Sequence, residues 1–397
     1  MPTLTQNLRA LPRPAWILFA GTFVNRFGSF VMPFLAIYMT RLGYTPTQAG
    51  LAVSSYGAGH LFASFIGGHL ADRIGRRHTI AISMLGSSAA MVGLSQARTL
   101  PAILSLAFVV GLIGEFYRPA ATALLGDLVK PEQRIAAFGM YRFAINLGFA
   151  AGPATAGLLA EHSFLWVFLG DAATSFVFGL VALFFLPHGV RSSSTDEAPA
   201  EGIRHALSNR PFVYFLAATF CLTWIEFQLH STLPLHITSI GYSTKAYGSL
   251  MSLNGVIIIL FELALTSWTQ RLPPKPLIAL GYALTGIGFA MTGVSSAMPL
   301  LVTSVVIWTL GEMVYAPVTG AYVTGLAPER YRGRYMGLWH TMWSSGMLIG
   351  PLMGTWIYER NPNALWLTCL ILGGVAAALS LLKATPRTQA DEAQSAA

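Results

Sequence analysis

Charged side chains inside long apolar runs are the residues of this chain best placed to do chemistry. Four acids and three bases lie well inside such runs: Glu115, Glu226, Glu262, Glu312, Arg26, Arg118 and Arg142. A charge at the depth of a lipid bilayer is costly, and such residues tend to mark solute pathways or proton relays. If each base pairs with one acid, one carboxyl is left over, and an unpaired carboxyl in a medium of low dielectric constant can exchange a proton near neutral pH.

Glu115 and Glu226 are the first candidates for proton coupling, because each lies near the middle of its run with polar neighbours. Glu312 comes next, since the Gly-Glu pair that contains it also occurs at Glu115. Glu262 is placed last because it lies nearer one end of its run. Each acid could instead form a static ion pair between helices. We expect Arg26 to pair with Glu115 or Glu226.

The composition indicates that these charges sit in membrane-spanning helices. Apolar residues make up 54% of the 397 and charged residues 10%, whereas soluble domains usually carry about a quarter charged residues. Most of the surface must therefore face lipid. Cys221 and Cys369 both lie in apolar runs, and we interpret them as unpaired core residues. No cofactor or metal site is predicted.

The apolar runs predict twelve spans of about 20 residues, the length that crosses a bilayer. They lie near 15–39, 47–70, 78–97, 101–125, 135–158, 163–186, 211–237, 246–268, 277–296, 299–325, 334–358 and 363–383. With both termini in the cytoplasm, 17 of the 24 Lys and Arg residues fall on the cytoplasmic side and four outside. This asymmetry supports the topology and explains the net charge of +8 without a nucleic-acid partner.

A polar stretch and an internal repeat divide the spans six and six. We interpret 187–210 as a flexible cytoplasmic linker between bundles at 1–186 and 211–385, with a polar tail at 386–397. The repeat has a constant offset of 198 residues and relates Gly139, Gly148, Gly152, Pro153 and Glu161 to Gly337, Gly346, Gly350, Pro351 and Glu359. Pro131-Glu132-Gln133-Arg134 recurs as Pro328-Glu329-Arg330 with one residue slipped.

The connection between the second and third spans carries a dense motif. It contains Gly68, Asp72, Arg73, Gly75, Arg76 and Arg77. Gly68 would allow two helices to approach closely, Gly75 a tight reversal, and the arginines hold the turn in the cytoplasm. The string resembles the G-x-x-x-D-R-x-G-R-R loop of the major facilitator superfamily. That resemblance implies two six-helix halves with substrate held between them near the midplane.

The same resemblance assigns a role to Asp127, at the cytoplasmic end of the fourth span. It implies that Asp127 joins Asp72 and Arg76 in a charge lock that holds the cytoplasmic side closed when the outer side is open. The alternative is an ordinary solvated loop acid. The repeat carries no second copy of the loop motif, because the equivalent position after the eighth span lacks the acid and the glycines.

The fifth span resembles the glycine signature of superfamily exporters that exchange substrate for protons. Its matching residues are Gly139, Gly148, Gly152, Pro153 and Gly157, with Ala156 in place of a first paired glycine. Small residues at helical spacing could instead simply pack two membrane helices. A second departure is Ala107, where many drug:proton antiporters carry an arginine one turn before the glycine of the fourth span.

Aromatic and amide side chains inside the spans are candidates for the substrate cavity. They are Asn25, Tyr38, Tyr141, Asn146, Trp308, Tyr315, Trp339 and Trp343. Such rings can stack on planar or cationic ligands, although single rings in spans more often contact lipid.

These patterns predict an all-α membrane protein of twelve helices in two pseudo-symmetric bundles, monomeric and located in a bacterial inner membrane. The predicted function is proton-coupled antiport that exports small hydrophobic or cationic compounds by alternating access. A carboxyl in the cavity would bind a proton from outside or a substrate from inside, but not both. The alternative is proton-coupled uptake of a nutrient or peptide, since Asn25-Arg26-Phe27 faintly resembles a peptide-transporter motif. No Walker loop, H-E-x-x-H or G-x-S-x-G occurs, which disfavours an enzyme.

Overall fold

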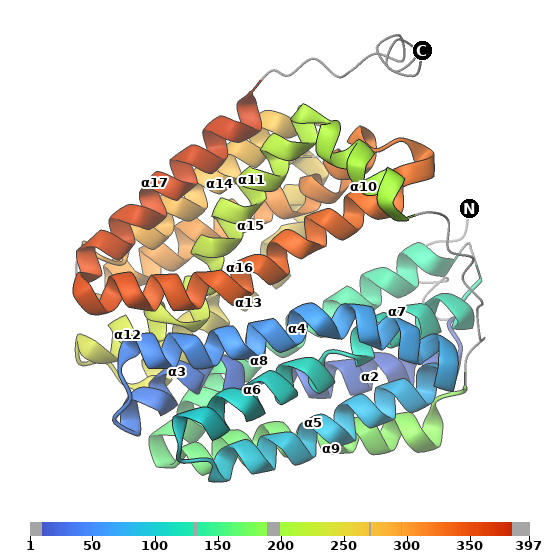
Figure 1. Ribbon diagram of the computed structural model, residues 1–397, viewed down its shortest axis with the longest axis horizontal. Helices are drawn as coiled ribbons and strands as arrows, with labels where there is room; N and C mark the ends of the chain where they lie inside the picture. The colour runs from blue at the N-terminus through green and yellow to red at the C-terminus, as the bar shows by residue number, and fades with distance from the viewer. Residues whose placement is uncertain (1–9, 131–132, 189–198, 270, 295, 383–397) are drawn as a thin grey trace. The chain divides into compact units, whose positions relative to one another are not determined.

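The structure is a computed structural model that describes residues 10–130, 133–188, 199–269, 271–294 and 296–382. These residues are almost entirely helical and contain no strand. The helices are α2 (Arg13–Phe27), α3 (Val31–Arg41), α4 (Pro46–Ile74), α5 (Arg76–Gln96), α6 (Leu100–Gly114), α7 (Tyr117–Leu128), α8 (Arg134–His162), α9 (Phe164–Phe185), α10 (Pro199–Ser208), α11 (Arg210–Glu226), α12 (Thr232–Ser239), α13 (Thr244–Thr269), α14 (Pro274–Met291), α15 (Met298–Leu326), α16 (Arg332–Arg360) and α17 (Pro362–Leu381) (Figure 1).

Each of the twelve predicted spans corresponds to a helix or a pair of consecutive helices. Nine segments of the described chain are long and apolar enough to cross a membrane by length and composition. Besides the short α10 and α12, the helices outside that set are α4, α14 and α16, which match the predicted spans 47–70, 277–296 and 334–358. Their apolar character is diluted by glycine and proline and, in α4 and α16, also by serine and histidine. The structure thus has the helical architecture that the sequence predicts.

Three spans that the sequence predicts as continuous are broken in the structure. The span 15–39 divides into α2 and α3, the span 101–125 into α6 and α7, and the span 211–237 into α11 and α12, with the 3-10 turn Phe227–His230 between the last two. A proline lies early in each second segment: Pro33, Pro119 and Pro234. A proline ring clashes with the carbonyl four residues earlier and cannot donate to it. Those carbonyls belong to Ser29, Glu115 and His230, at or beside each break.

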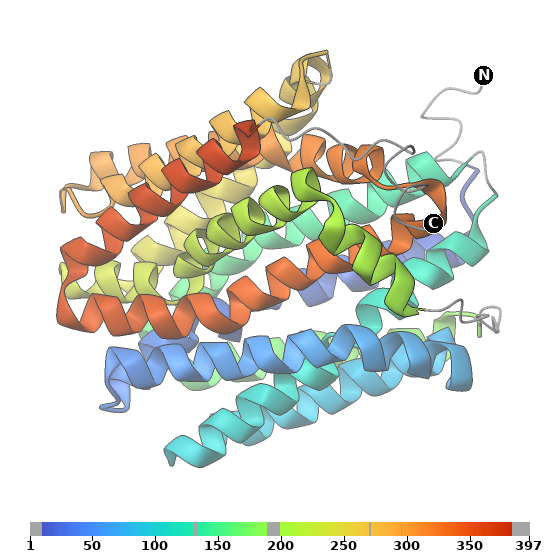
Figure 2. The ribbon, with the colours of Figure 1, turned by 45° about the horizontal axis from the view of Figure 1, so that its top comes forward.

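Part of the predicted flexible linker is a helix. Residues 199–208 form α10, which packs against the segment leading into α16 (Figure 1, Figure 2). The Tyr331 hydroxyl donates to Glu201 Oε1 at 2.7 Å, and the His205 ring lies 4.9 Å from that of Tyr331. The helix forms because these side chains find partners outside the segment, which its polar composition does not show. Residues 189–198, 131–132 and the predicted tail 386–397 lie outside the described residues.

The chain forms two compact units, and the first comprises Met1–Ser194, Gln228–Leu260 and Met347–Arg360. Within it α5 packs on α9, α4 on α6, and α2 on α8 and α9. Small residues allow these contacts: a Cβ on Gly111 of α6 would lie 2.1 Å from the Tyr56 carbonyl oxygen of α4. The buried core includes Leu18, Tyr117 and Phe178.

The second unit comprises Thr195–Phe227, Phe261–Gly346 and Asn361–Ala397. Here α14 packs between α15 and α17, and α11 packs on α17. A Cβ on Gly286 would lie 2.7 Å from the Cα of Gly373, so the backbones of α14 and α17 touch at these glycines. The buried core includes Phe212, Phe215 and Tyr282.

Candidate functional site

Glu115 lies at the break between α6 and α7 and is surrounded by basic side chains. Its carboxylate is 3.6 Å from Arg26 Nη2, 3.4 Å from Arg118 Nε and 3.6 Å from His60 Nε2. Glu115 and Arg26 are both buried, at 7% and 8% exposure, whereas the Arg118 side chain is 48% exposed. Of the two partners expected for Arg26, the structure has Glu115. The result is a buried cluster with more positive than negative groups, which stabilises the carboxylate of Glu115.

Several polar atoms of this cluster are buried without a hydrogen-bond partner among the described residues. They are Arg26 Nε, His60 Nδ1, Glu115 Oε2 and the Tyr117 hydroxyl. A buried donor or acceptor left unsatisfied costs about 1–3 kcal/mol, so such atoms are suited to bind water or a polar solute. The Arg26 guanidinium carbon also lies 5.4 Å from the Tyr117 ring centre and 5.7 Å from that of Phe149. The cluster can therefore recognise a polar group, with aromatic rings beside it.

His60 is a residue of this cluster that the sequence reasoning missed. It lies on α4, inside the predicted span 47–70, so the criterion that selected Arg26 would also have selected it. Its Nε2 lies 3.5 Å from Arg118 Nη1 as well as close to Glu115. A neutral imidazole at this place can accept from an arginine, and a protonated one can pair with the carboxylate.

The Ser83 side chain of α5 satisfies backbone hydrogen-bonding groups at the helix break beside Glu115. Its hydroxyl donates to the Ile113 carbonyl at 2.6 Å and accepts from the Tyr117 N–H at 3.1 Å. These are backbone groups at the facing ends of α6 and α7, which a continuous helix would have paired internally. The side chain of Asp171 acts likewise on the first span. It is buried and accepts from the Val31 N–H at the start of α3, at 3.0 Å.

Glu226 ends α11 at the third break and belongs to the second unit. The Tyr315 hydroxyl of α15 donates to its Oε1 at 2.5 Å. The carboxyl of Glu312, one turn before Tyr315, interacts electrostatically with that of Glu226. No Lys or Arg described in this unit lies within salt-bridge distance of Glu226. Two carboxyl groups therefore interact inside the second unit with no described Lys or Arg paired to Glu226, which disfavours charge on both at once.

The loop motif between α4 and α5 holds an ion pair at its predicted place. Arg76 Nη1 pairs with Asp127 Oδ2 and donates to the Ala123 carbonyl at 3.3 Å. Asp72 adds a further favourable charge interaction with Arg76. Arg73 is exposed and Arg77 half-buried, and neither forms a salt bridge with an acid in the described loop. The structure thus brings together the three residues of the expected charge lock.

The structure agrees with the role expected for Gly75 of this motif but not with the role expected for Gly68. Gly75 has a φ of +89°, a conformation that favours glycine, as the expected tight reversal requires. Gly68 does not mediate a close helix contact, because no described atom lies within 4 Å of the position its Cβ would take. The close approach is made by the preceding residue, Gly67, whose Cβ would lie 2.9 Å from the Cα of Phe116. The sequence pattern therefore identifies the correct helix for the close contact but assigns the contact to Gly68 instead of Gly67.

The glycines of the fifth span pack directly on the charge cluster. A Cβ on Gly148 of α8 would lie 2.6 Å from Arg26 Cβ, and one on Gly152 would lie 2.6 Å from the Phe27 carbonyl oxygen. Gly157 meets the start of α13 at the Thr244 carbonyl, and Pro153 lies inside α8 between them. Gly139 meets no described atom within 4 Å. Gly148 and Gly152 therefore set how closely α8 approaches the end of α2.

Other predicted residues lie away from these clusters. Arg142 is exposed, where the sequence predicts a buried charge partner, and Glu262 of α13 is half-buried. Tyr38 lies between Phe164 and Phe168, and its hydroxyl accepts from Arg98 Nη1 at 2.7 Å, so it faces the helix ends and not a cavity.

The remaining aromatic and amide candidates are distributed over both units. Asn25 is buried and donates to the Ser175 hydroxyl at 3.3 Å, and Tyr141 is buried in the core of the first unit. Trp308 is buried against the ring of Phe289 at 5.5 Å. Asn146, Trp339 and Trp343 are half-buried. The Trp339 indole N–H has no hydrogen-bond partner among the described residues, which leaves a donor for a ligand.

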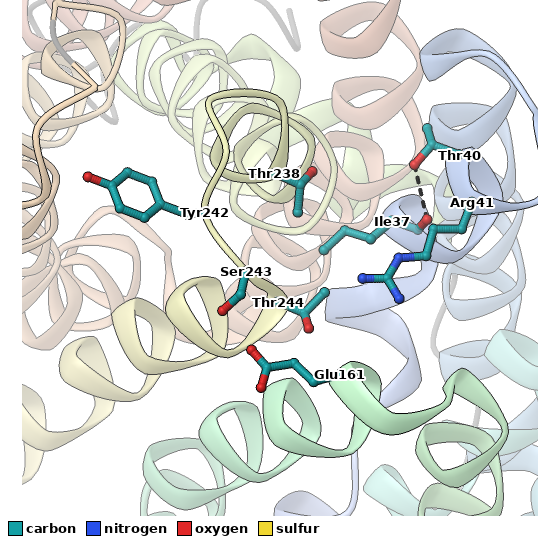
Figure 3. A pocket seen from close by; sticks show the side chains of 8 residues that line it. All are labelled: Ile37, Thr40, Arg41, Glu161, Thr238, Tyr242, Ser243 and Thr244. Carbon is teal, nitrogen blue, oxygen red and sulfur yellow. Dashed lines mark hydrogen bonds between the residues drawn. The ribbon is translucent and has the colours of Figure 1, made fainter.

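A pocket of about 380 Å³ lies at the helix ends of the first unit, apart from the charge cluster. It is lined by Ile37, Thr40, Arg41, Glu161, Thr238, Tyr242, Ser243 and Thr244 (Figure 3). Hydroxyl groups dominate its wall, and Arg41 and Glu161 supply one charge of each sign. None of the predicted coupling or cavity residues lines it.

Comparison with known proteins gives a consistent family. A profile described as "Major Facilitator Superfamily" matches residues 18–260 and 231–397. The chain is 29% identical to the MFS-type transporter YttB of Bacillus subtilis (strain 168), over 94% of this chain and 95% of that protein. It is 23% identical to a Na(+), Li(+), K(+)/H(+) antiporter of Planococcus maritimus, over 89% and 91% of the two chains.

Two further comparisons cover similar lengths. The multidrug resistance protein MdtH of Salmonella typhimurium (strain LT2) is 23% identical, over 86% of this chain and 87% of that one. The crystal structure of a POT family transporter in complex with 5-aminolevulinic acid superposes with a TM-score of 0.76, over 93% of this chain and 95% of that chain. Its sequence identity is 18%, so this likeness concerns the fold alone.

Proposed function

Because the chain belongs to the Major Facilitator Superfamily and is therefore an integral membrane transporter and not an enzyme, we propose that it is a proton-coupled antiporter. It exports small hydrophobic or cationic compounds from the cytoplasm of a bacterium across the inner membrane. Its six-helix halves, 1–186 and 211–385, alternate access to the two sides, and both termini lie in the cytoplasm.

The observation that carries this proposal is the environment of Glu226. Its carboxyl lies at a helix break, hydrogen-bonded to Tyr315 at 2.5 Å, and faces the charge of Glu312. Two carboxyls in apolar surroundings share a proton more readily than they ionise together. A cationic solute would favour the doubly ionised pair and displace that proton. Because the proton and the solute compete for the same pair of carboxyl groups, the movement of one is coupled to that of the other.

The charge cluster around Glu115 has a different role in this mechanism. Arg26 and Arg118 both lie within 3.6 Å of its carboxylate, so the negative charge of Glu115 is strongly compensated. We assign the Glu226–Glu312 pair to the proton and to the cationic group that competes with it, and this cluster to the recognition of polar groups. The unsatisfied atoms of Arg26 and Tyr117 are the groups that a polar part of the solute would engage.

Relatives support export without fixing the substrate. The protein of Planococcus maritimus is described as an antiporter that uses protons, and MdtH as a multidrug resistance protein. The resemblance of the fifth span to the exporter signature, at Gly148, Gly152 and Pro153, supports the same direction.

The alternative function is proton-coupled uptake of a nutrient or peptide. One observation favours it: Arg26, Arg118 and His60 surround a single acid. Such a cluster with an excess of basic groups would attract the carboxylate of a peptide or another anionic group. A solute panel must therefore contain both cationic dyes and dipeptides.

Transport into proteoliposomes under an imposed pH gradient tests the proposal. Exchange of a cationic dye against protons, in the orientation that corresponds to export, is the expected result. Dipeptide movement in the same direction as protons, with no dye exchange, would favour the alternative. Solute flux that ignores the pH gradient for every member of the panel would exclude both.

A further inference from the structure

The helix ends around the pocket of Figure 3 are built twice from the same short sequence. Gly43-Tyr44-Thr45 and Gly241-Tyr242-Ser243 are 198 residues apart, the offset that also relates Glu161 to Glu359. The two glycines have φ values of +89° and +93°, and each turn leads into the next helix, α4 or α13. The two turns therefore have the same local backbone as well as the same residues.

At each turn a carboxylate from the opposite repeat caps the helix that begins there. Glu359, at the end of α16, accepts from the Thr47 N–H in the first turn of α4 at 2.8 Å. Glu161, at the end of α8, interacts favourably with the Ser243 hydroxyl and the Lys245 N–H at the start of α13. Figure 3 shows the Glu161 carboxyl directed toward Ser243. A carboxylate at a helix N-terminus satisfies free N–H groups and interacts favourably with the helix dipole.

A second pair of contacts, deeper along the same helices, repeats with the same offset. The Ser54 hydroxyl of α4 accepts from the Leu352 N–H at 3.1 Å, and the Ser252 hydroxyl of α13 accepts from the Ala154 N–H at 3.0 Å. Both serines are buried, at 2% and 8% exposure, whereas Glu161 and Glu359 are exposed. Each interface therefore has a buried contact and, at its rim, an exposed carboxylate that water can reach.

We propose that Glu161 and Glu359 are two matched latches of an outer gate, each holding the end of its own helix against the first turn of a helix from the other repeat. The proposal rests on the function proposed above, whose topology places these helix ends outside. Both latches must release before this face opens. Exposed pairs of this kind are weak, which suits contacts that form and break in every transport cycle.

The Glu359 latch is intact at neutral pH. The hydrogen bonds from Thr47 lower the pKa of the Glu359 carboxyl, and the nearby Arg360 acts in the same direction. A contact that depends on an ionised carboxylate with a lowered pKa persists above the ordinary pKa and is lost as the pH falls through the lowered value. Measurements at pH 7 therefore report the formed latch.

A cysteine placed beneath the gate measures its opening without any substrate. In a background with Cys221→Ala and Cys369→Ala, Ala49→Cys on α4 introduces a thiol at a position that is fully buried here. Its rate of labelling by a membrane-impermeant maleimide from the outer side reports the open population. The test variants are Glu161→Gln and Glu359→Gln, with Glu329→Gln as the control for loss of an exposed acid.

Each latch variant is expected to raise the labelling rate roughly fivefold, the factor that corresponds to loss of a typical helix cap. The double variant should raise it by about the product. Thr47→Pro, which deletes the donor N–H in the first turn of α4, should also raise the labelling rate. Labelling at the control rate in both single variants and the double variant would overturn the proposal.

The outcome separates this inference from the proposed function. Faster labelling in protein that shows no proton-driven transport would retain the latches and reject the proposed coupling. Unchanged labelling in protein that transports normally would reject the latches alone. Size-exclusion chromatography of each purified variant verifies that the labelled protein is folded.

Discussion

Two carboxyl groups at helix breaks show how surroundings assign different roles to the same side chain. Glu115 lies within 3.6 Å of Arg26 and has Arg118 at 3.4 Å, so its negative charge is compensated. Glu226 accepts a hydrogen bond from Tyr315 and faces Glu312, another acid. The first environment favours a permanent charge, and the second favours a carboxyl that changes its protonation state.

The permanent charge of Glu115 leads to a stability prediction. Glu115→Gln removes the carboxylate that faces the buried Arg26, and breaking one partner of a buried ion pair typically costs about 3–5 kcal/mol. The variant should unfold at a clearly lower temperature in detergent. Arg26→Gln combined with Glu115→Gln should recover part of the loss, because no buried charge is then uncompensated. Equal melting temperatures for the single variant and the wild type would show that the cluster contributes nothing to stability.

At the scale of elements, the broken helices place the ionisable groups. Arg26 is at the end of α2, Glu115 follows α6 and Glu226 ends α11. Each break leaves backbone N–H and C=O groups that need partners at membrane depth. Side chains such as Ser83 supply those partners, so the protein can keep a polar segment where a continuous helix would present none.

Ser83 is therefore expected to contribute more to stability than an ordinary buried serine does. Ser83→Ala deletes two hydrogen bonds to the facing ends of α6 and α7, and the expected loss of stability is about 1–3 kcal/mol. The matched control is Ser380→Ala, because the Ser380 hydroxyl is also buried but bonds only the carbonyl of its own helix, at Ala376. Thermal unfolding of both purified variants gives the comparison. A loss in Ser83→Ala no larger than in the control would refute the bridging role.

The sequence predicts where helices lie better than where they break. Apolar run length determines a span directly, so each of the twelve predicted spans has its helix or helix pair. The breaks were missed although Pro33, Pro119 and Pro234 mark them, because membrane helices also contain unbroken prolines such as Pro153. Whether a proline breaks a helix depends on partners such as Ser83, which the linear sequence does not reveal.

The sequence likewise predicts some features of the candidate site and not others. Residue type and depth select Arg26, Glu115 and Glu226, since few charges occur in apolar runs. The partners of these residues depend on the tertiary structure. Glu226 accepts a hydrogen bond from Tyr315 in the second unit, and His60 contacts Glu115 from a separate helix. Arg142 has the right residue type and depth but is exposed, because the direction of a side chain cannot be read from depth alone.

At the scale of the whole molecule, the number of spans decides the topology. Nine described segments meet a strict length and composition criterion, and α4, α14 and α16 complete the predicted twelve. An even number of crossings places both ends of the chain on one side, and an odd number places them on opposite sides. The excess of Lys and Arg in the predicted cytoplasmic connections supports the even number.

Reporter fusions at the two ends test this topology. A reporter that is active only in the cytoplasm should be active when attached before Met1 and also when attached after Ala397. A periplasm-specific reporter should be inactive at both places. Opposite results at the two ends would show that an odd number of helices crosses the membrane and would contradict the proposed arrangement of α4, α14 and α16.

Proton coupling through Glu226 is the central claim, and comparison of exchange with gradient-driven transport in Glu226→Gln proteoliposomes tests it most directly. Solute exchange without a gradient needs no proton, and Glu312 still offers a carboxyl to a cationic solute, so the variant should retain exchange within about twofold of the wild type. Accumulation driven by an imposed pH gradient should fall by 10²-fold or more, the scale of losing a positioned proton-transfer group. Wild-type gradient-driven accumulation in Glu226→Gln, with Glu329→Gln as the control, would contradict the account.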